Sequence, residues 1–308
     1  MRRIAYGWIA LLVLGAITPA LAGKGGKAGG KPGGGDEDPP TLAAPEIAYF
    51  ISKGDKIMVM DADGANPTLV LRRVSGFTVQ PSWSADGSQL ILNATNEGNG
   101  IYGVSATGGS LTKLTATSSQ YLNRPVWSPV ATADETEKIL FEDEAANGSR
   151  DLFLMSTDGT GRVNLTDTAD VDEEYPTWSP DATQIAAVVS FTDENGVWGS
   201  DVRVYDLDLD AAGNALELSA GLDITAGTAI GHGDLAFLDW SRTTQQLAVS
   251  CYDPADGNWD IWVLDDDGLG TPSNLTSTSD ASERHPTWSP DDSQIAYQYN
   301  GSGTAGVY

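Results

Sequence analysis

From Glu46 to Tyr308 the chain is built of short apolar or alternating runs, separated by turns rich in Asp, Gly, Ser and Pro. The apolar runs carry many β-branched and aromatic residues, as in Gln89–Leu92 and Asp260–Leu264. Runs of this length and composition, bounded by turn residues, are typical of β-strands. The pattern therefore predicts an all-β domain.

One motif, Pro-x-Trp-Ser followed by a turn, gives these runs a common order. Copies lie at residues 81–87, 125–129, 176–181 and 286–291, and a degenerate copy lies at 238–241. Each Trp is followed by an apolar run, an alternating run that usually ends in an Asp-Gly turn, and a short run that ends in Leu-Thr or Ile-Thr. The interval between tryptophans is close to the length of one propeller blade. We therefore predict that each repeat forms one four-stranded antiparallel blade.

The two ends of the repeat region are incomplete. Residues 46–71 match the second, third and fourth strands of a repeat without a first, and residues 286–308 supply the first two strands and the start of a third. Counting both ends predicts a six-bladed β-propeller with incomplete terminal blades. A five-bladed ring in which the two ends share one blade is the alternative. In either case, circular closure would protect the strand edges.

The residues of the motif suit a structural role. Ser-Pro-Asp favours a type I turn, because Pro presets its own backbone angle and Asp or Ser bonds to nearby backbone groups. The Trp offers a large apolar face to the next blade. Because every repeat carries these residues, we assign them to packing and turn formation, and not to a specific function.

The first 45 residues differ in composition from the repeats. Met1-Arg2-Arg3 is followed by an apolar run from Trp8 to Ile17 and by the small residues Ala20-Leu21-Ala22, which predicts a signal peptide at residues 1–22. The run is too short for a comfortable membrane span; an uncleaved anchor is the alternative. No cysteine lies nearby for lipid attachment. Residues 23–45 are rich in Gly and Pro and predict a disordered linker, so that residues 46–308 form the propeller domain.

The composition is strongly acidic. With 43 acidic residues against 17 basic ones, the formal net charge is −26. A surface of this charge repels nucleic acid and anionic lipid, and suits basic partners or divalent cations. The only cysteine, Cys251, excludes an internal disulfide and lies in a strand-like run, where a buried, inert thiol is expected.

The order Pro-x-Trp-Ser-Pro-Asp, x-Ile-Ala, an alternating run with Asp-Gly, and Leu-Thr is similar to the TolB-type propeller repeat. That repeat also occurs in the propellers of prolyl-oligopeptidase-like peptidases. The resemblance covers residues 46–308 and implies a β-propeller, but no single activity, because such repeats serve as scaffolds, peptidase gates and lyases. The N-terminal α/β domain of TolB has no counterpart here. The Gly-x-Ser-x-Gly motif of the peptidases is also missing, so peptidase activity is not expected.

The segments that enter the first strands differ between repeats, and in a propeller such segments gather at one mouth of the central channel. The residues just before these strands are Gln80, Arg124, Tyr175, Phe237 and His285. We predict ligand or partner binding by Arg124, Glu174, Tyr175, His232, Glu283, Arg284 and His285.

Arg124 and Arg284 are the expected anchors, since a guanidinium can bind a carboxylate with two parallel hydrogen bonds. The alternative is that each Arg pairs with a neighbouring acid. Replacing Arg124, Tyr175 and His285 together by Ala is expected to leave folding intact.

The leading functional hypothesis is an exported, non-catalytic and monomeric scaffold in the periplasm or secreted fraction. It would bind an envelope or extracellular protein, or a small polar ligand, and no nucleic acid. The alternative is a metal-dependent lyase or hydrolase acting on acidic carbohydrate. This alternative rests on His232 and His285, because lyases that the repeat resembles hold a divalent metal with histidines near the channel.

No catalytic residue, metal site or cofactor is predicted from the sequence. Asp61–Gly64 and Asp265–Gly268 resemble fragments of calcium loops, but they lack the remaining ligands of a 12-residue loop. We expect both segments to be turns.

Overall fold

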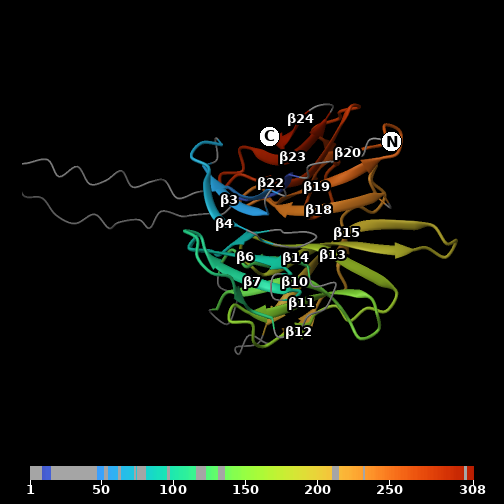
Figure 1. Ribbon diagram of the computed structural model, residues 1–308. Coiled ribbons are helices and arrows are strands. Elements are labelled where there is room, and N and C mark those ends of the chain that lie inside the picture. The colour runs from blue at the N-terminus through green and yellow to red at the C-terminus, as the bar shows by residue number, and fades with distance from the viewer. Residues whose placement is uncertain are drawn as a thin grey trace, which may run out of the picture.

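The computed structural model describes residues 9–14, 47–51, 55–61, 64–72, 74, 81–95, 98–115, 123–130, 136–209, 215–231, 233–301 and 304–308. Within these ranges every regular element is a β-strand. The strands form six antiparallel sheets arranged around a centre, and the colour runs around the ring from blue to red (Figure 1). The prediction of a six-bladed β-propeller is confirmed, and the described residues contain no helix long and apolar enough to span a membrane.

The blades follow the order of the chain. Blade 1 contains β1 (Ile9–Leu14), β2 (Ile47–Ile51), β3 (Lys56–Met60) and β4 (Thr68–Arg72). Blade 2 contains β5 (Ser82–Trp83), β6 (Gln89–Ala94), β7 (Gly100–Ser105) and β8 (Thr112–Lys113). Blade 3 contains β9 (Asn123–Trp127), β10 (Lys138–Glu144), β11 (Arg150–Ser156) and β12 (Val163–Asn164).

The second half of the ring contains the only five-stranded sheet among the described residues, blade 4. Blade 4 contains β13 (Val171–Trp178), β14 (Gln184–Thr192), β15 (Trp198–Leu209), β16 (Ala215–Leu218) and β17 (Leu222–Asp223). Blade 5 contains β18 (Asp234–Trp240), β19 (Gln246–Asp253), β20 (Asn258–Asp265) and β21 (Ser273–Asn274). Blade 6 contains β22 (Ala281–Trp288), β23 (Ile295–Gly301) and β24 (Thr304–Val307). Both β16 and β17 pair with β15, and the hairpin of β14 and β15 projects from the ring (Figure 1).

The repeated Ser residues of blades 2 to 6 and the repeated Thr residues of blades 2 to 5 make the same hydrogen bonds from blade to blade. The hydroxyl after each motif Trp accepts the N–H of the residue at the start of the second strand or just before it, at 3.0 Å between Ser84 and Gln89 and at 2.9 Å between Ser179 and Gln184. The Thr of each Leu-Thr or Ile-Thr pair accepts an N–H from the third strand of its blade. These pairs are Thr115 with Ile101, Thr166 with Leu152, Thr225 with Val202, and Thr276 with Ile261. The structural role predicted for the motif is therefore confirmed.

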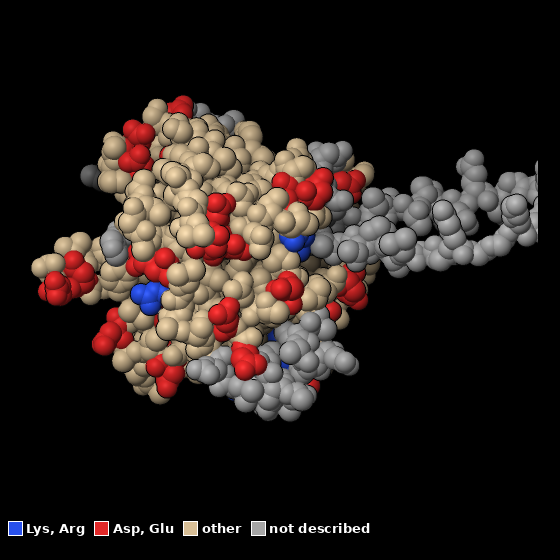
Figure 2. Space-filling view, turned by 180° about the vertical axis from the view of Figure 1, so that it is seen from behind, with Lys and Arg blue, Asp and Glu red and all other residues tan. Residues whose placement is uncertain are grey.

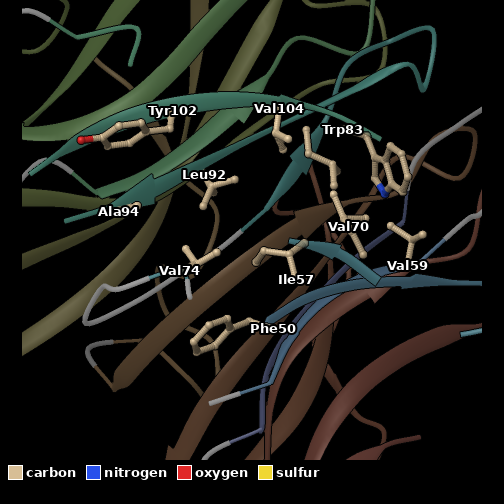
Figure 3. Close-up of a cluster of buried hydrophobic side chains, with 12 residues drawn as sticks. Phe50, Ile57, Val59, Val70, Val74, Trp83, Leu92, Ala94, Tyr102 and Val104 are labelled. Atoms are coloured by element: carbon tan, nitrogen blue, oxygen red, sulfur yellow. The ribbon is translucent and has the colours of Figure 1, made fainter. Parts of the chain in front are cut away.

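The core lies between neighbouring blades. Figure 3 shows Phe50, Ile57 and Val59 of blade 1 facing side chains of blade 2, including Leu92 and Trp83. The motif tryptophans of blades 2 to 6 are all buried. Burying even a smaller apolar side chain such as Leu or Phe stabilises a fold by about 1.5–3 kcal/mol, so contacts between blades hold the ring together.

Two further expectations concern single elements. Cys251 is buried and unpaired, as predicted, and burial raises the pKa of its thiol to about 12. Blade 1 was expected to lack a first strand, whereas β1 occupies that position and pairs with β2 from Ile9↔Ile51 to Leu14↔Ile47. This strand comes from the segment predicted as a signal peptide, and the predicted linker lies outside the described residues.

Candidate functional site

A bulge interrupts the inner strand of blades 3, 4, 5 and 6 a few residues before the Trp. At each bulge the pairing register shifts against the second strand of the blade. The residues at the four bulges have positive φ: Arg124 (48°), Tyr175 (54°), Phe237 (56°) and His285 (55°). A non-glycine residue in this region costs about 1–3 kcal/mol, and such residues cluster at functional sites. We call these four residues the collar.

The collar side chains stack on one another at the channel. The guanidinium carbon of Arg124 lies 3.6 Å from the centre of the Tyr175 ring. The Tyr175 and Phe237 rings meet edge to face at 4.6 Å, and the Phe237 and His285 rings lie 3.6 Å apart. The structure thus brings together Arg124, Tyr175, Phe237 and His285, which the sequence placed at corresponding positions. They lie within the first strands, at the bulges, and not just before these strands as predicted, because each inner strand continues past its bulge. Gln80 lies outside the described residues.

The collar lines a cavity in the channel. This cavity of about 90 Å³ is also lined by Pro81, Pro125, Pro176, Pro286, Ser82, Val126, Thr177, Leu238, Asp239 and Thr287. A second cavity, of about 70 Å³, shares several of these residues and continues towards the motif tryptophans. A single water needs roughly 10–15 Å³ of such space, so the first cavity has room for several waters or for an inserted side chain.

The charge of Arg124 is compensated inside the protein. One of its terminal nitrogens lies 2.6 Å from both carboxylate oxygens of Glu142, a residue that is 0% exposed. The same Glu142 accepts the backbone N–H of Tyr175, so it links blade 3 to the collar residue of blade 4. Glu174 lies 3.6 Å from Arg124 and also pairs with Arg150. The sequence did not single out Glu142 or Arg150, because their pairing depends on strands distant in the chain.

The pairing of Arg124 with Glu142 makes Arg124 important for stability. Removing Arg124 would leave Glu142 as an uncompensated buried charge, which typically costs about 3–5 kcal/mol. Replacing Arg124, Tyr175 and His285 together by Ala is therefore not expected to leave folding intact. Variants that probe the collar should keep Arg124 and change the aromatic residues.

Burial and neighbouring charges leave the collar rings uncharged at neutral pH. Burial lowers the pKa of His285 well below 6.5, and the positive charges of Arg124 and Arg284 lower it further. Burial also raises the pKa of Tyr175 above its usual value of 10.0. The collar thus combines three uncharged rings with one cation that is already paired.

An acid that was not predicted as a functional residue lines the cavity as well. Asp239 lines both cavities, and its carboxylate accepts the backbone N–H of Trp288 at 2.7 Å. Burial raises its pKa to about 6, against the lowering effect of that hydrogen bond and of Arg242. The residues just before the other motif tryptophans are Ser82, Val126, Thr177 and Thr287. Comparing these positions would have shown Asp239 as the one acid among them.

Of the other predicted residues that the structure describes, none lines the cavity. Glu283 is buried and accepts the hydroxyl of Thr278 at 2.9 Å. The guanidinium of Arg284 lies 4.4 Å from the centre of the Trp259 ring. His232 lies outside the described residues. Among the residues that are described, no group of three or more His, Cys, Asp or Glu side chains is arranged to hold a metal ion.

Comparison with known proteins gives structural matches only. No protein-family model and no curated protein matches the sequence. TolB from Acinetobacter baumannii aligns with a TM-score of 0.58 at 19% identity, over 82% of this chain and 61% of that one. An oligogalacturonate lyase from Vibrio parahaemolyticus aligns with a TM-score of 0.54 at 13% identity, over 85% and 73% of the two chains.

A gluconolactonase from Xanthomonas campestris aligns with a TM-score of 0.56 at 15% identity, over 83% of this chain and 79% of that one. Proteins with these names differ in what they do, and the sequence identity to each is low. The likeness therefore establishes the fold and no activity. The chain has the six-bladed β-propeller fold that it shares with the TolB structure.

Proposed function

We propose that the protein is an exported, non-catalytic and monomeric scaffold that binds a partner protein at its collar, in the periplasm or the secreted fraction. The observation that carries this proposal is the collar itself. Four unlike side chains occupy one strained backbone position in four successive blades, and they stack at the lined cavity of the channel. Packing between blades alone does not explain why residues of such different chemistry occupy a strained backbone position.

The chemistry of the collar favours a partner segment with an apolar or ring-bearing side chain. The cavity is small, and three of the four collar residues present uncharged rings. Aromatic rings supply large contact areas at low cost in side-chain entropy. The Nε–H of Arg124 is buried and has no hydrogen-bond partner among the described residues, which leaves one donor for a carbonyl of the partner.

The surface charge favours a partner that is neutral or basic. Acidic side chains are spread over the face in Figure 2, and basic ones are sparse. Arg124, Arg150 and Arg162 pair with acids of their own or neighbouring blades, so their charges contribute little to the outward field. Complementary charge speeds the encounter of two proteins and disfavours partners of like charge.

Site-specific photo-cross-linking in the cells that make the protein tests this proposal. A photoreactive residue is placed at His285, in the collar, or at Leu269, which is 87% exposed outside it. We expect the position 285 probe to capture one discrete protein that the position 269 probe does not. The further change Phe237→Ala should abolish the capture, because it removes the ring between Tyr175 and His285 and leaves the Arg124–Glu142 pair intact.

Equal capture from both positions, or capture that survives Phe237→Ala, would contradict binding at the collar. The enzymatic alternative is tested on the purified protein with oligogalacturonate, with and without added divalent cations. Release of an unsaturated product that depends on His285 would replace the scaffold proposal by the lyase hypothesis.

A further inference from the structure

The innermost position of blade 1 is filled differently from that of every other blade. In blades 2 to 6 the strand carrying the Trp motif occupies it. In blade 1 the occupant is β1, which lies against β22 and β23 of blade 6 and against β5 of blade 2. Its pairing with β2 shifts between Ala10 and Leu12, as the inner strands of blades 3 to 6 shift at their bulges. An apolar segment without the motif therefore reproduces the backbone course of an inner strand.

The edge of β2 that pairs with β1 carries apolar residues that are buried in the structure. Ile47, Ala48 and Phe50 of β2 are buried, and Ile47 packs against Ala296 and Val307 of the last blade. Without a neighbour, β2 would present unpaired N–H and C=O groups beside apolar side chains at the inner end of its blade. Unpaired buried backbone groups are costly, and an open edge recruits any strand that fits it.

The connection between β1 and β2 is much longer than their pairing requires. Leu14 pairs with Ile47, so a two-residue turn would suffice to join the strands. The chain instead places residues 15–46, rich in Gly and Pro, between them. Through a long connection, β1 acts as a tethered ligand whose effective concentration depends on the length of the tether. It also belongs to the segment predicted to be removed on export.

We propose that the inner edge of β2 is an acceptor site for an apolar extended peptide of about six residues. Ile9–Leu14 is its ligand within the chain, and a free peptide of the same pattern binds there when β1 leaves. Hydrogen bonds along the main chain supply the affinity, and the alternation of side chains along the strand supplies the specificity. This site is separate from the collar and does not depend on the function proposed for it.

Disulfide capture in the full-length chain tests the site. Val13 pairs with Ala48, so Val13→Cys combined with Ala48→Cys should cross-link under mild oxidation. The control is Ile9→Cys with Ala48→Cys, because Ile9 pairs with Ile51, three residues from Ala48. We expect the in-register pair to form at least about tenfold faster, given the narrow geometry of a disulfide. Cys251 is buried and should not interfere.

Competition then tests exchange. A synthetic peptide with the sequence of Ile9–Leu14 and lysines at both ends should slow cross-linking of the in-register pair severalfold when in excess over the effective concentration of β1. The same peptide carrying Leu12→Pro should not compete, because proline cannot donate a ladder hydrogen bond. Equal cross-linking of both cysteine pairs, or equal effects of both peptides, would overturn the proposal.

A second measurement avoids the introduced cysteines, which could disturb the buried position of Ala48. In the full chain, Leu12→Pro should accelerate hydrogen exchange of the β2 amides and leave exchange in β14, on the other side of the ring, unchanged. Unchanged exchange in β2 would mean that β1 does not cover this edge.

Discussion

Burial raises the pKa of two acids, Glu173 in β13 and Asp239 at the cavity. Glu173, whose carboxylate accepts the hydroxyl of Thr168, has its pKa raised to about 7 by burial, and Asp239 has its pKa raised to about 6. Both acids are easier to ionise in the unfolded chain than in the folded one. At these positions the fold is therefore most stable when the carboxyl groups carry a proton.

Asp239→Asn should remove one part of the pH dependence of stability. The folded pKa of Asp239 is about 6 and its ordinary value is 3.8, so its stabilising contribution is complete below about pH 4 and is lost as the pH rises through 6. The loss amounts to about 3 kcal/mol. Asn retains an oxygen that can accept the N–H of Trp288. Urea unfolding at about pH 4 and pH 7.5 should show a smaller decline in the variant.

Glu173 titrates in both proteins and cancels in this comparison. If the wild-type protein and the Asp239→Asn variant lost the same stability between the two pH values, Asp239 would not be a buried acid of the channel.

The ion pair of Arg124 and Glu142 gives a second prediction at this scale. Arg124→Ala should lower the free energy of unfolding by about 3–5 kcal/mol, because it strands the buried Glu142. Adding Glu142→Leu removes the stranded charge and should restore most of the loss, although Glu142 also accepts the N–H of Tyr175. Denaturant unfolding of both single variants and the double variant measures this coupling. If the losses of the two single variants simply added up in the double variant, the ion pair would not explain the effect of Arg124→Ala.

At the scale of the strand, the strands that carry the repeated motif could be predicted from the sequence, and the strand without the motif could not. The Trp-Ser motif marks each inner strand of blades 2 to 6, because Ser84 and its equivalents make the same local hydrogen bond in these five blades. By contrast, β1 carries no motif, and its apolar run resembles a leader. The stacking of the collar depends on a positive φ at the bulges, which no pattern of apolar positions reveals.

The motif tryptophans allow a matched test of packing between blades. Trp178 is buried and its indole N–H donates to the carbonyl of Val126 in the preceding blade, at 3.2 Å. Trp198, at the start of β15, is 52% exposed. Trp178→Ala should lower the free energy of unfolding by about 3–5 kcal/mol, and Trp198→Ala by well under half of that. Similar losses for the two variants would mean that blade packing does not depend on the motif.

At the scale of the whole molecule, the net charge of −26 opposes folding through repulsion between like charges. Exposed charges are screened over about 10 Å at 0.1 M salt, whereas buried pairs such as Arg124 and Glu142 are screened much less. Raising sodium chloride from about 0.02 to 0.5 M should therefore raise the midpoint of thermal unfolding. A lower midpoint at high salt would show that surface ion pairs outweigh the repulsion.

The bulges at the collar also affect which residues of the ring can be substituted without a change of fold. The backbone strain is set by the bulge and is imposed on Arg124, Tyr175, Phe237 and His285 alike, although their side chains have little in common. Exchanging a side chain that makes no buried ion pair, such as Phe237, therefore need not alter the path of the chain. Each blade can vary its own collar residue without a change of fold, although collar side chains of neighbouring blades contact each other. In evolution or in protein engineering, the binding surface of the collar can therefore change by substitution while the propeller fold stays the same.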